Sequence, residues 1–174
     1  MTRTHEPDAA GDGAAADVAA SAERDEIVDA VLNASRVLVS VAARSLADVG
    51  EEVTLTQYRS LVVLASRGPQ GVASLAEALG VTPPTASRLC DRLVRKALVR
   101  RRTDRSDRRQ VRVALTPAGR RLVDVVTERR RAEITALVSS IDAAARPSLA
   151  AGLRQLSQAA GEVPEQHWSS GWDL

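Results

Sequence analysis

Apolar residues recur every three or four positions over most of the chain, which is the spacing of amphipathic helices. From Ala22 to Val49 this pattern predicts one long helix, and Gly50 ends it. A second helix is expected to start after Thr54 or Thr56, either of which is a good N-cap, and to run through Ser66.

Two shorter helices are predicted in the middle of the chain. Ser74 is a candidate N-cap for a helix over residues 75–79, which Gly80 closes. Thr82-Pro83-Pro84 then starts a helix that runs to about Lys96, because Thr is a good N-cap and proline at the first helical position loses no hydrogen bond. The apolar face of this helix consists of Ala86, Leu89, Cys90 and Leu93.

After this helix the apolar period changes to two, the period of a strand. Leu98 and Val99 begin a short strand, residues 100–109 form a charged hairpin, and residues 111–115 alternate as in a half-buried second strand. Thr116-Pro117 repeats the cap-plus-proline signature and starts a long helix. A last helix covers about 142–160, provided that Pro147 lies in its first turn.

These elements predict a mainly α protein with a small β-wing. The fold class is a winged helix–turn–helix, residues 54–116, on an α-helical dimerisation scaffold made by residues 22–50 and 117–160. Residues 22–160 are thus expected to form a single domain.

The two ends of the chain are predicted to be tails. Residues 1–21 are rich in Ala and Asp and lack the apolar segment of a signal peptide, so they are expected to be disordered. Residues 161–174 form a polar tail with Trp168 and Trp172, which either pack onto a partner subunit or stay disordered.

Composition agrees with a helical protein. The 174 residues are 44% hydrophobic but only 2% aromatic, so the core must consist of Leu, Val, Ile and Ala. No apolar run of about 18 residues exists, and no membrane span is expected. The single cysteine, Cys90, excludes an internal disulfide and fits the reducing cytoplasm.

Basic residues are concentrated in the middle of the chain. Residues 83–112 hold eleven basic and three acidic side chains, whereas the whole chain has a net charge of only +2. Such a basic segment in an otherwise acidic chain indicates contact with nucleic-acid phosphates. The basic residues are Arg88, Arg92, Arg95, Lys96, Arg100, Arg101, Arg102, Arg105, Arg108, Arg109 and Arg112.

In a winged helix–turn–helix, the second helix of the motif enters the major groove of DNA and the hairpin reaches flanking backbone or minor groove. Thr85 and Arg88 lie on the exposed side of the first turns and are the best candidates to contact base edges, since Arg forks onto guanine. Thr82, Ser87 and Arg92 are expected to contact phosphates. The predicted contacts on this helix are Thr82, Pro84, Thr85, Ser87, Arg88 and Arg92.

Over roughly Leu55 to Gly119 the chain resembles the MarR family of bacterial regulators. The matching segments, specific through their order and spacing, are Leu55-Thr56-Gln57-Tyr58-Arg59, Ser74 to Val81, Thr85 to Leu89, Leu93 to Val99, Asp107-Arg108-Arg109 and Val113 to Gly119. The family commonly has Gly where Ala97 stands, which suggests a slightly different exit from the preceding helix.

The resemblance implies roles for the wing. The family's Asp-x-Arg signature maps onto Asp107 and Arg109, so that Arg109 would enter the minor groove while Asp107 holds its guanidinium. A wing-stabilising salt bridge is the alternative and is compatible with that role. Arg105 and Arg108 are alternative residues for the tip.

The resemblance also implies a homodimer, assembled through the terminal helices, on a palindromic operator of double-stranded DNA. The apolar surface of the first and the last two helices supports this independently, because a small winged domain cannot cover it. A small aromatic or phenolic effector, bound where the dimer helices meet the DNA-binding lobe near Tyr58 and Arg59, would release the DNA. Tyr58 is more easily explained as a core residue.

Other functions fit the sequence less well. An enzyme is not expected, because His5 and His167 lie in the tails, Cys90 has no histidine near it in sequence, and neither a cofactor loop nor a metal cluster is present. A winged helix that binds only protein normally lacks a basic wing. Cys90 is a weak candidate for oxidant sensing, since an apolar site makes a thiol inert while nearby arginines act in the opposite direction. The prediction is a DNA-binding transcriptional regulator, a repressor more readily than an activator.

Overall fold

The computed structural model describes residues 9–47, 53–103, 111–165 and 168. The chain divides into two compact units, residues 1–40 and 41–174. The first unit contains most of helix α1 (Ala9–Ala47), and its side chains over residues 17–40 are exposed. The predicted disorder is wrong for residues 9–21, because alanine, the residue with the highest helix propensity, dominates this stretch.

The second unit holds the other elements and, among the described residues, every buried side chain. It is mainly α with a small sheet, which confirms the predicted fold class. In chain order the elements are α2 (Leu55–Arg67), β1 (Gln70–Gly71), α3 (Val72–Leu79), α4 (Pro83–Arg95), β2 (Val99–Thr103), β3 (Val111–Leu115), α5 (Pro117–Ser139) and α6 (Arg146–Ala159).

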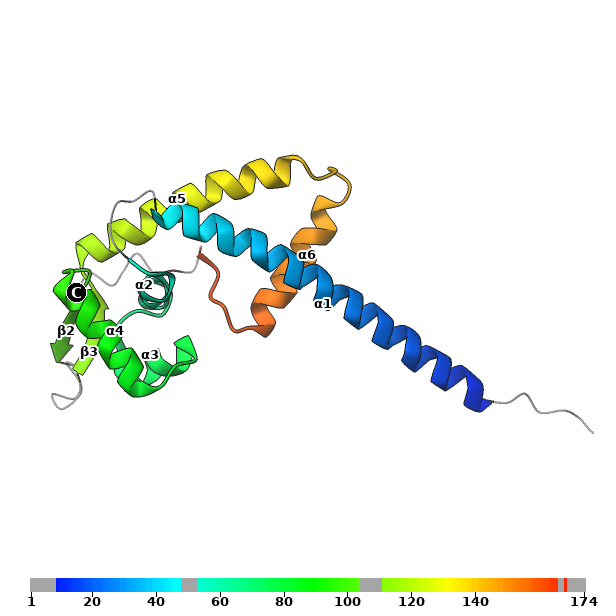
Figure 1. The fold of residues 1–174 in the computed structure, drawn as a ribbon, viewed down its shortest axis with the longest axis horizontal. Helices are drawn as coiled ribbons and strands as arrows, with labels where there is room; N and C mark the ends of the chain where they lie inside the picture. Colours follow the sequence, from blue (N-terminus) through cyan, green and yellow to red (C-terminus); the bar gives the residue numbers. More distant parts are fainter. Residues whose placement is uncertain (1–8, 48–52, 104–110, 166–167, 169–174) are drawn as a thin grey trace, which may run out of the picture. The chain divides into compact units, whose positions relative to one another are not determined.

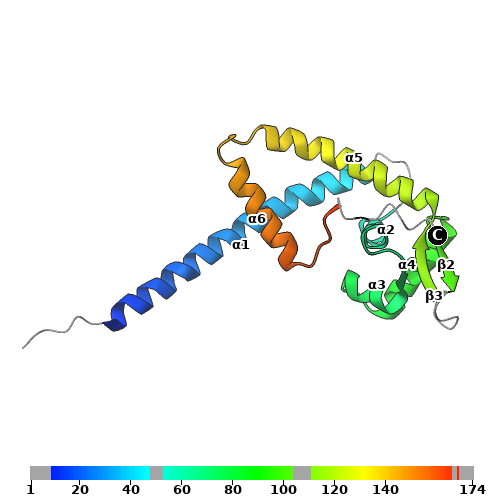
Figure 2. The ribbon, with the colours of Figure 1, turned by 180° about the vertical axis from the view of Figure 1, so that it is seen from behind.

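The sheet is antiparallel, with the strand order β1-β3-β2. Val99 pairs with Leu115, and Thr103 pairs with Val111. β2 therefore starts where predicted but continues to Thr103, into the segment that was expected to form the charged hairpin. The hairpin lies beside α4, and β3 runs directly into α5 (Figure 1 and Figure 2). β1 pairs Gln70 with Val113 and was missed, because two residues carry no period.

The helix starts follow the predicted caps with one exception. Thr54 caps α2 in a capping box with Gln57, as one of the two candidates predicted. α3 begins at Val72 with Gly71 as N-cap, so the assignment of Ser74 as the cap is wrong. Pairing in β1 holds Gly71 extended immediately before the helix, and Ser74 therefore falls inside it.

One hydrophobic core joins α2, α3, α4, the sheet and the first half of α5. Leu61, Leu75, Leu93 and Leu98 are among its fully buried side chains. Tyr58 is 4% exposed and belongs to this core, as the sequence favoured. The predicted apolar face of α4, made by Ala86, Leu89, Cys90 and Leu93, is buried as well.

A carboxylate on α5 holds the last turns of α1, which belong to the second unit. Arg44 Nη2 donates to Glu133 Oε2 at 2.6 Å, and Ser45 Oγ donates to Glu133 Oε1 at 3.2 Å. Ser45 is buried, whereas a third of the Glu133 side chain is exposed. The hydrogen bonds from Arg44 are the main cause that lowers the pKa of Glu133.

This interaction predicts an acid-sensitive contribution to stability. Because the folded pKa of Glu133 lies below its usual 4.5, the contribution is complete above that value and is lost as the pH falls through the folded pKa. Glu133→Gln is therefore expected to lower the unfolding midpoint at neutral pH and to flatten its decline in acid, measured by thermal unfolding across pH. Arg44→Ala should have the same effect. An unchanged acid decline in both variants would contradict the assignment.

Ala97 ends α4 in a left-handed conformation, with a φ of 55°, and is the one non-glycine residue with positive φ among those described. Its N–H donates to Val94 O at 2.9 Å, and the N–H of Leu98 donates to Leu93 O at 3.0 Å. These two bonds form a Schellman motif, in which the residue with the left-handed conformation is usually glycine. Gly80 makes the same pair of bonds at the end of α3. Alanine in place of the family's common glycine therefore leaves a strained backbone conformation at the end of α4.

Ala97→Gly is expected to stabilise the protein by about 1 kcal/mol, because glycine adopts this conformation without the steric cost of a Cβ. Ala97 is exposed and gives up no packing. Gly80→Ala is the matched opposite change, with open space around its Cβ and a φ of 64°, and should destabilise by a similar amount. Urea unfolding measures both. Changes of the same sign in the two variants would refute the strain argument.

The joint between the wing and α5 is unusually tight. Thr116 Oγ1 caps α5 by accepting from Gly119 N at 3.1 Å, and the same hydroxyl donates to Ala97 O at 2.6 Å. Thr116 N donates to Leu98 O at 3.0 Å. A Cβ on Gly119 would lie 2.0 Å from Leu98 O. The first turn of α5 therefore packs directly on the backbone that links α4 to β2.

Candidate nucleic-acid interface

α4 presents a sharply divided surface. Ala86, Leu89, Cys90 and Leu93 are buried, as predicted. Of the predicted DNA contacts, Thr82, Pro84, Thr85, Arg88 and Arg92 are exposed and Ser87 is half-buried. The structure therefore brings all six to the accessible part of one helix, with Thr85 and Arg88 in its first two turns.

The start of α4 carries few backbone donors. Pro83 and Pro84 occupy its first two positions and have no N–H, and Ala86 N is satisfied by Thr82 O at 3.0 Å. Thr82 is the N-cap by position, but its hydroxyl makes no capping bond and instead lies 3.0 Å from the hydroxyl of Thr85. If the N-terminus of α4 contacts a polyanion, the hydrogen bonds must therefore come mainly from side chains.

The wing is formed by β2 and β3 next to this surface. Arg100 is exposed and Arg102 half-buried on β2, and Arg112 is exposed on β3, where it donates to Pro69 O at 3.4 Å. The predicted tip residues Arg105, Asp107, Arg108 and Arg109 lie outside the described residues.

An ion pair connects the wing to α4. Arg101 Nη2 on β2 lies 2.6 Å from Asp91 Oδ1 on α4. Both side chains are nearly half exposed, so the pair adds little to stability and acts mainly on the orientation of the hairpin. The residues are ten positions apart, and only the antiparallel path of β2 along α4 reveals the contact.

Cys90 is a free, fully buried thiol on the inner side of α4. Burial raises the pKa of the Cys90 thiol. The positive charge of Arg101 lowers this pKa, and the negative charge of Asp91 raises it further. A thiol that is inaccessible and protonated reacts slowly with oxidants.

Peroxide is therefore expected to leave the DNA affinity of the protein unchanged. The measurement compares the dissociation constant before and after peroxide treatment in the wild type and in Cys90→Ala. A weaker affinity after treatment in the wild type alone would show that the thiol senses oxidants after all.

The segment after α6 packs onto the protein's own core. Arg59 on α2 forms a two-pronged ion pair with Glu162, and Arg131 Nη2 on α5 lies 3.0 Å from Glu165 Oε2. Trp168 packs against the core, and its indole N–H donates to Val163 O at 3.0 Å. The predicted disorder is therefore wrong for Trp168, while packing on a partner subunit stays a prediction and Trp172 lies outside the described residues.

The described residues hold no group of three His, Cys, Asp or Glu side chains that would suit a metal ion. None of the described helices is long and apolar enough to cross a membrane.

A short helix, a second helix with a polar outer side and a basic antiparallel hairpin together define a winged helix–turn–helix protein. Residues 53–111 match the model of the MarR family. The chain belongs to this family.

Individual relatives agree with this assignment. The crystal structure of Rv1404 from Mycobacterium tuberculosis is 42% identical, with a TM-score of 0.76 over 81% of this chain and 96% of that one. A MepR mutant from Staphylococcus aureus, bound to an oligodeoxyribonucleotide, is 26% identical, with a TM-score of 0.53 over 72% of this chain and 91% of its own. The transcriptional repressor NicR from Pseudomonas putida is 30% identical over 60% of this chain, and the match spans 66% of NicR, just under two thirds.

Proposed function

We propose that this protein is a homodimeric repressor that binds a palindromic operator in double-stranded DNA. The observation that carries the proposal is the divided surface of α4, whose inner side is locked in the core while Thr85 and Arg88 are exposed beside a basic hairpin. The fold of the MepR mutant bound to an oligodeoxyribonucleotide supports the same use of this motif.

Each part of the surface has a separate role in the proposal. α4 enters the major groove, where Thr85 and Arg88 read base edges, and Thr82, Ser87 and Arg92 contact phosphates. The wing enters the minor groove through Arg109, positioned by Asp107, with Arg105 and Arg108 nearby. Pro84 belongs to the same surface and fixes the direction of the first turn.

Exposed apolar side chains support the homodimer. α6 buries none of its side chains, and Leu149, Leu153 and Leu156 are each between 39% and 47% exposed at one- and two-turn spacing. α1 leaves Ile27, Val28, Val31 and Leu32 exposed. A second copy would cover these helices and place two copies of α4 one DNA turn apart.

Repression requires only that the dimer occlude a promoter. We infer that a small aromatic effector relieves it by favouring a spacing of the two α4 helices that does not fit the operator. Membership of the family supports this step. Cell extracts and candidate phenolic compounds that all fail to weaken DNA binding would contradict it.

The test is selection of DNA fragments by the purified protein, followed by affinity at two salt concentrations. An inverted repeat, bound as a dimer with an affinity that falls steeply in salt, is the expected result, because neutralised phosphates release counterions. Weakening by Arg88→Ala or Arg109→Ala supports the assigned surface. Binding without a shared sequence and without salt dependence would instead indicate a protein partner.

A further inference from the structure

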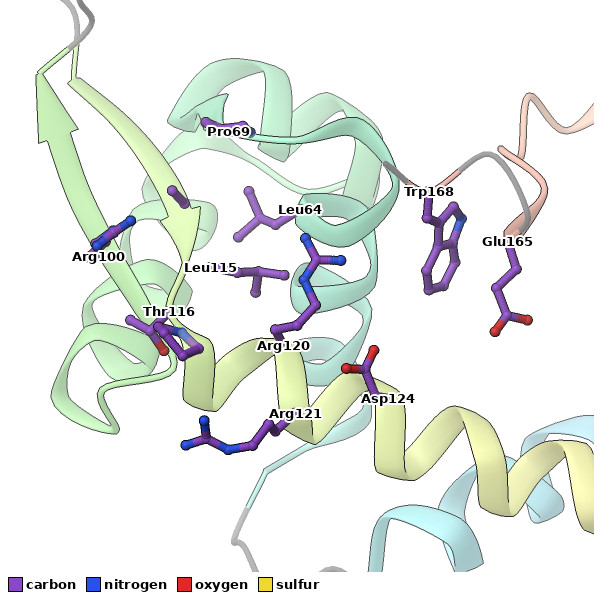
Figure 3. Close-up of a pocket in the computed structure, with 12 residues that line it drawn as sticks. Leu64, Pro69, Arg100, Leu115, Thr116, Arg120, Arg121, Asp124, Glu165 and Trp168 are labelled. Atoms are coloured by element: carbon purple, nitrogen blue, oxygen red, sulfur yellow. The ribbon is translucent and has the colours of Figure 1, made fainter. Parts of the chain in front are cut away.

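A cavity of about 620 Å³ lies between the base of the wing, the first turns of α5 and the segment after α6 (Figure 3). This volume is in the range of sites for small molecules. None of the six predicted DNA contacts on α4 lines it. The cavity is therefore separate from the exposed face of α4.

Two opposite charges on α5 face this cavity without meeting each other. Arg120 and Asp124 are one helical turn apart, and both side chains point into the cavity in Figure 3. Opposite charges at this spacing are close enough to pair. Neither side chain makes an ion pair or a hydrogen bond with another residue that the structure describes. The cavity thus offers a free guanidinium and a free carboxylate about one helical turn apart.

Other elements add a second carboxylate and an apolar surface to the cavity. Glu165 lies on the same side as Asp124 in Figure 3 and is held by Arg131 at 3.0 Å. Leu64, Leu115 and Trp168 line the space around the Arg120 guanidinium. The ring of Trp168 is fixed by its bond to Val163 O.

We propose that this end of the cavity binds a free amino acid with a large apolar side chain. The carboxylate of the ligand forms an ion pair with Arg120, because a planar guanidinium can donate two parallel hydrogen bonds to a carboxylate. The ammonium of the ligand pairs with Asp124, and Glu165 lies close by. The side chain packs among Leu64, Leu115 and Trp168. A simple anion fits this end poorly, because the unpaired carboxylate of Asp124 stands beside the guanidinium of Arg120. Arg100 and Arg121 line the other end of the cavity, and Arg121 extends away from Trp168 in Figure 3.

The test uses the protein's own fluorescence. The chain has two tryptophans, so Trp172→Phe leaves Trp168 as the only one. L-Phenylalanine, which does not absorb at wavelengths that excite tryptophan, is titrated into this variant of the full chain, and calorimetry on the wild type measures the same binding. A saturable change in Trp168 emission and a matching heat are expected.

Ligand analogues and variants separate the two charge contacts. N-Acetyl-L-phenylalanine lacks the ammonium, L-phenylalaninamide lacks the carboxylate, and glycine lacks the side chain. Each is expected to bind about tenfold or more weakly, as is L-phenylalanine to Arg120→Gln or Asp124→Asn. Arg154→Gln, an exposed change on α6, should leave binding unaltered.

Binding of N-acetyl-L-phenylalanine as tight as that of L-phenylalanine would overturn the proposal and leave an anion site. No saturable signal in either method would also overturn it. Circular dichroism checks that each variant is folded, and the analogue series remains decisive with the wild type alone. No DNA is present in these assays, so their failure is distinguishable from failure of the proposed function.

Discussion

Gly119→Ala is expected to lower the free energy of unfolding by about 3 kcal/mol, the upper end of what overpacking of a well-packed site costs. The added Cβ would lie 2.0 Å from Leu98 O and 3.0 Å from Leu98 C, which are backbone atoms that no side-chain rotation can move. Relief requires α5 to shift away from the end of α4. That shift would also stretch the bonds that Thr116 makes to Ala97 O and Leu98 O.

The matched control is Gly152→Ala in the middle of α6. Nothing lies within 4 Å of the Cβ added there, and alanine is favoured over glycine in a helix interior, so this variant should gain about 1 kcal/mol. Urea unfolding of both variants at one protein concentration measures the difference. A Gly119→Ala protein as stable as the wild type would show that the contact of α5 with the α4 exit is looser than described.

Arg88→Ala is expected to weaken binding to the selected operator by roughly tenfold to a hundredfold for each half-site, because a forked interaction with a base edge is removed. Because two copies of α4 engage a palindrome, the effect on the dimer is about the square of that factor. Binding to unrelated DNA should change much less, since that affinity depends on phosphates. Fluorescence anisotropy with both DNAs gives the ratio.

Arg92→Ala distinguishes base reading from phosphate binding on the same helix. It should weaken binding to both DNAs about equally and reduce the slope of log affinity against log salt by about one for each phosphate that the arginine neutralises. Equal weakening on operator and unrelated DNA in Arg88→Ala would assign Arg88 to phosphate as well, and base reading would then rest on other side chains.

The sequence predicted those parts of the fold that are set by local chemistry. Thr54 and Thr116 start their helices through side-chain bonds to the following turn, and Gly80 ends α3 in the left-handed conformation. The buried face of α4 follows from the 3.6-residue period alone. The departure at Ala97 was predicted only through the resemblance to the MarR family, which commonly has glycine at this position.

Features that depend on tertiary pairing were not predictable in this way. β1 exists only because Gln70 and Gly71 meet β3, and this pairing moves the start of α3 to Val72. The ion pairs of Arg101 with Asp91 and of Arg59 with Glu162 join segments whose proximity the sequence does not encode locally. The cavity beside Trp168 was missed for the same reason, since its walls come from α2, β3, α5 and the segment after α6.

The double proline at the start of α4 has a consequence for how operator preference can change over evolutionary time. Pyrrolidine rings hold the first turn in its helical conformation, while core packing on the opposite side fixes the rest of the helix. Thr85 and Arg88 contribute neither a capping bond nor a buried side chain. Substitutions at these two positions should therefore be nearly neutral for folding, so descendants of this protein can acquire new target sites without first acquiring compensating stability.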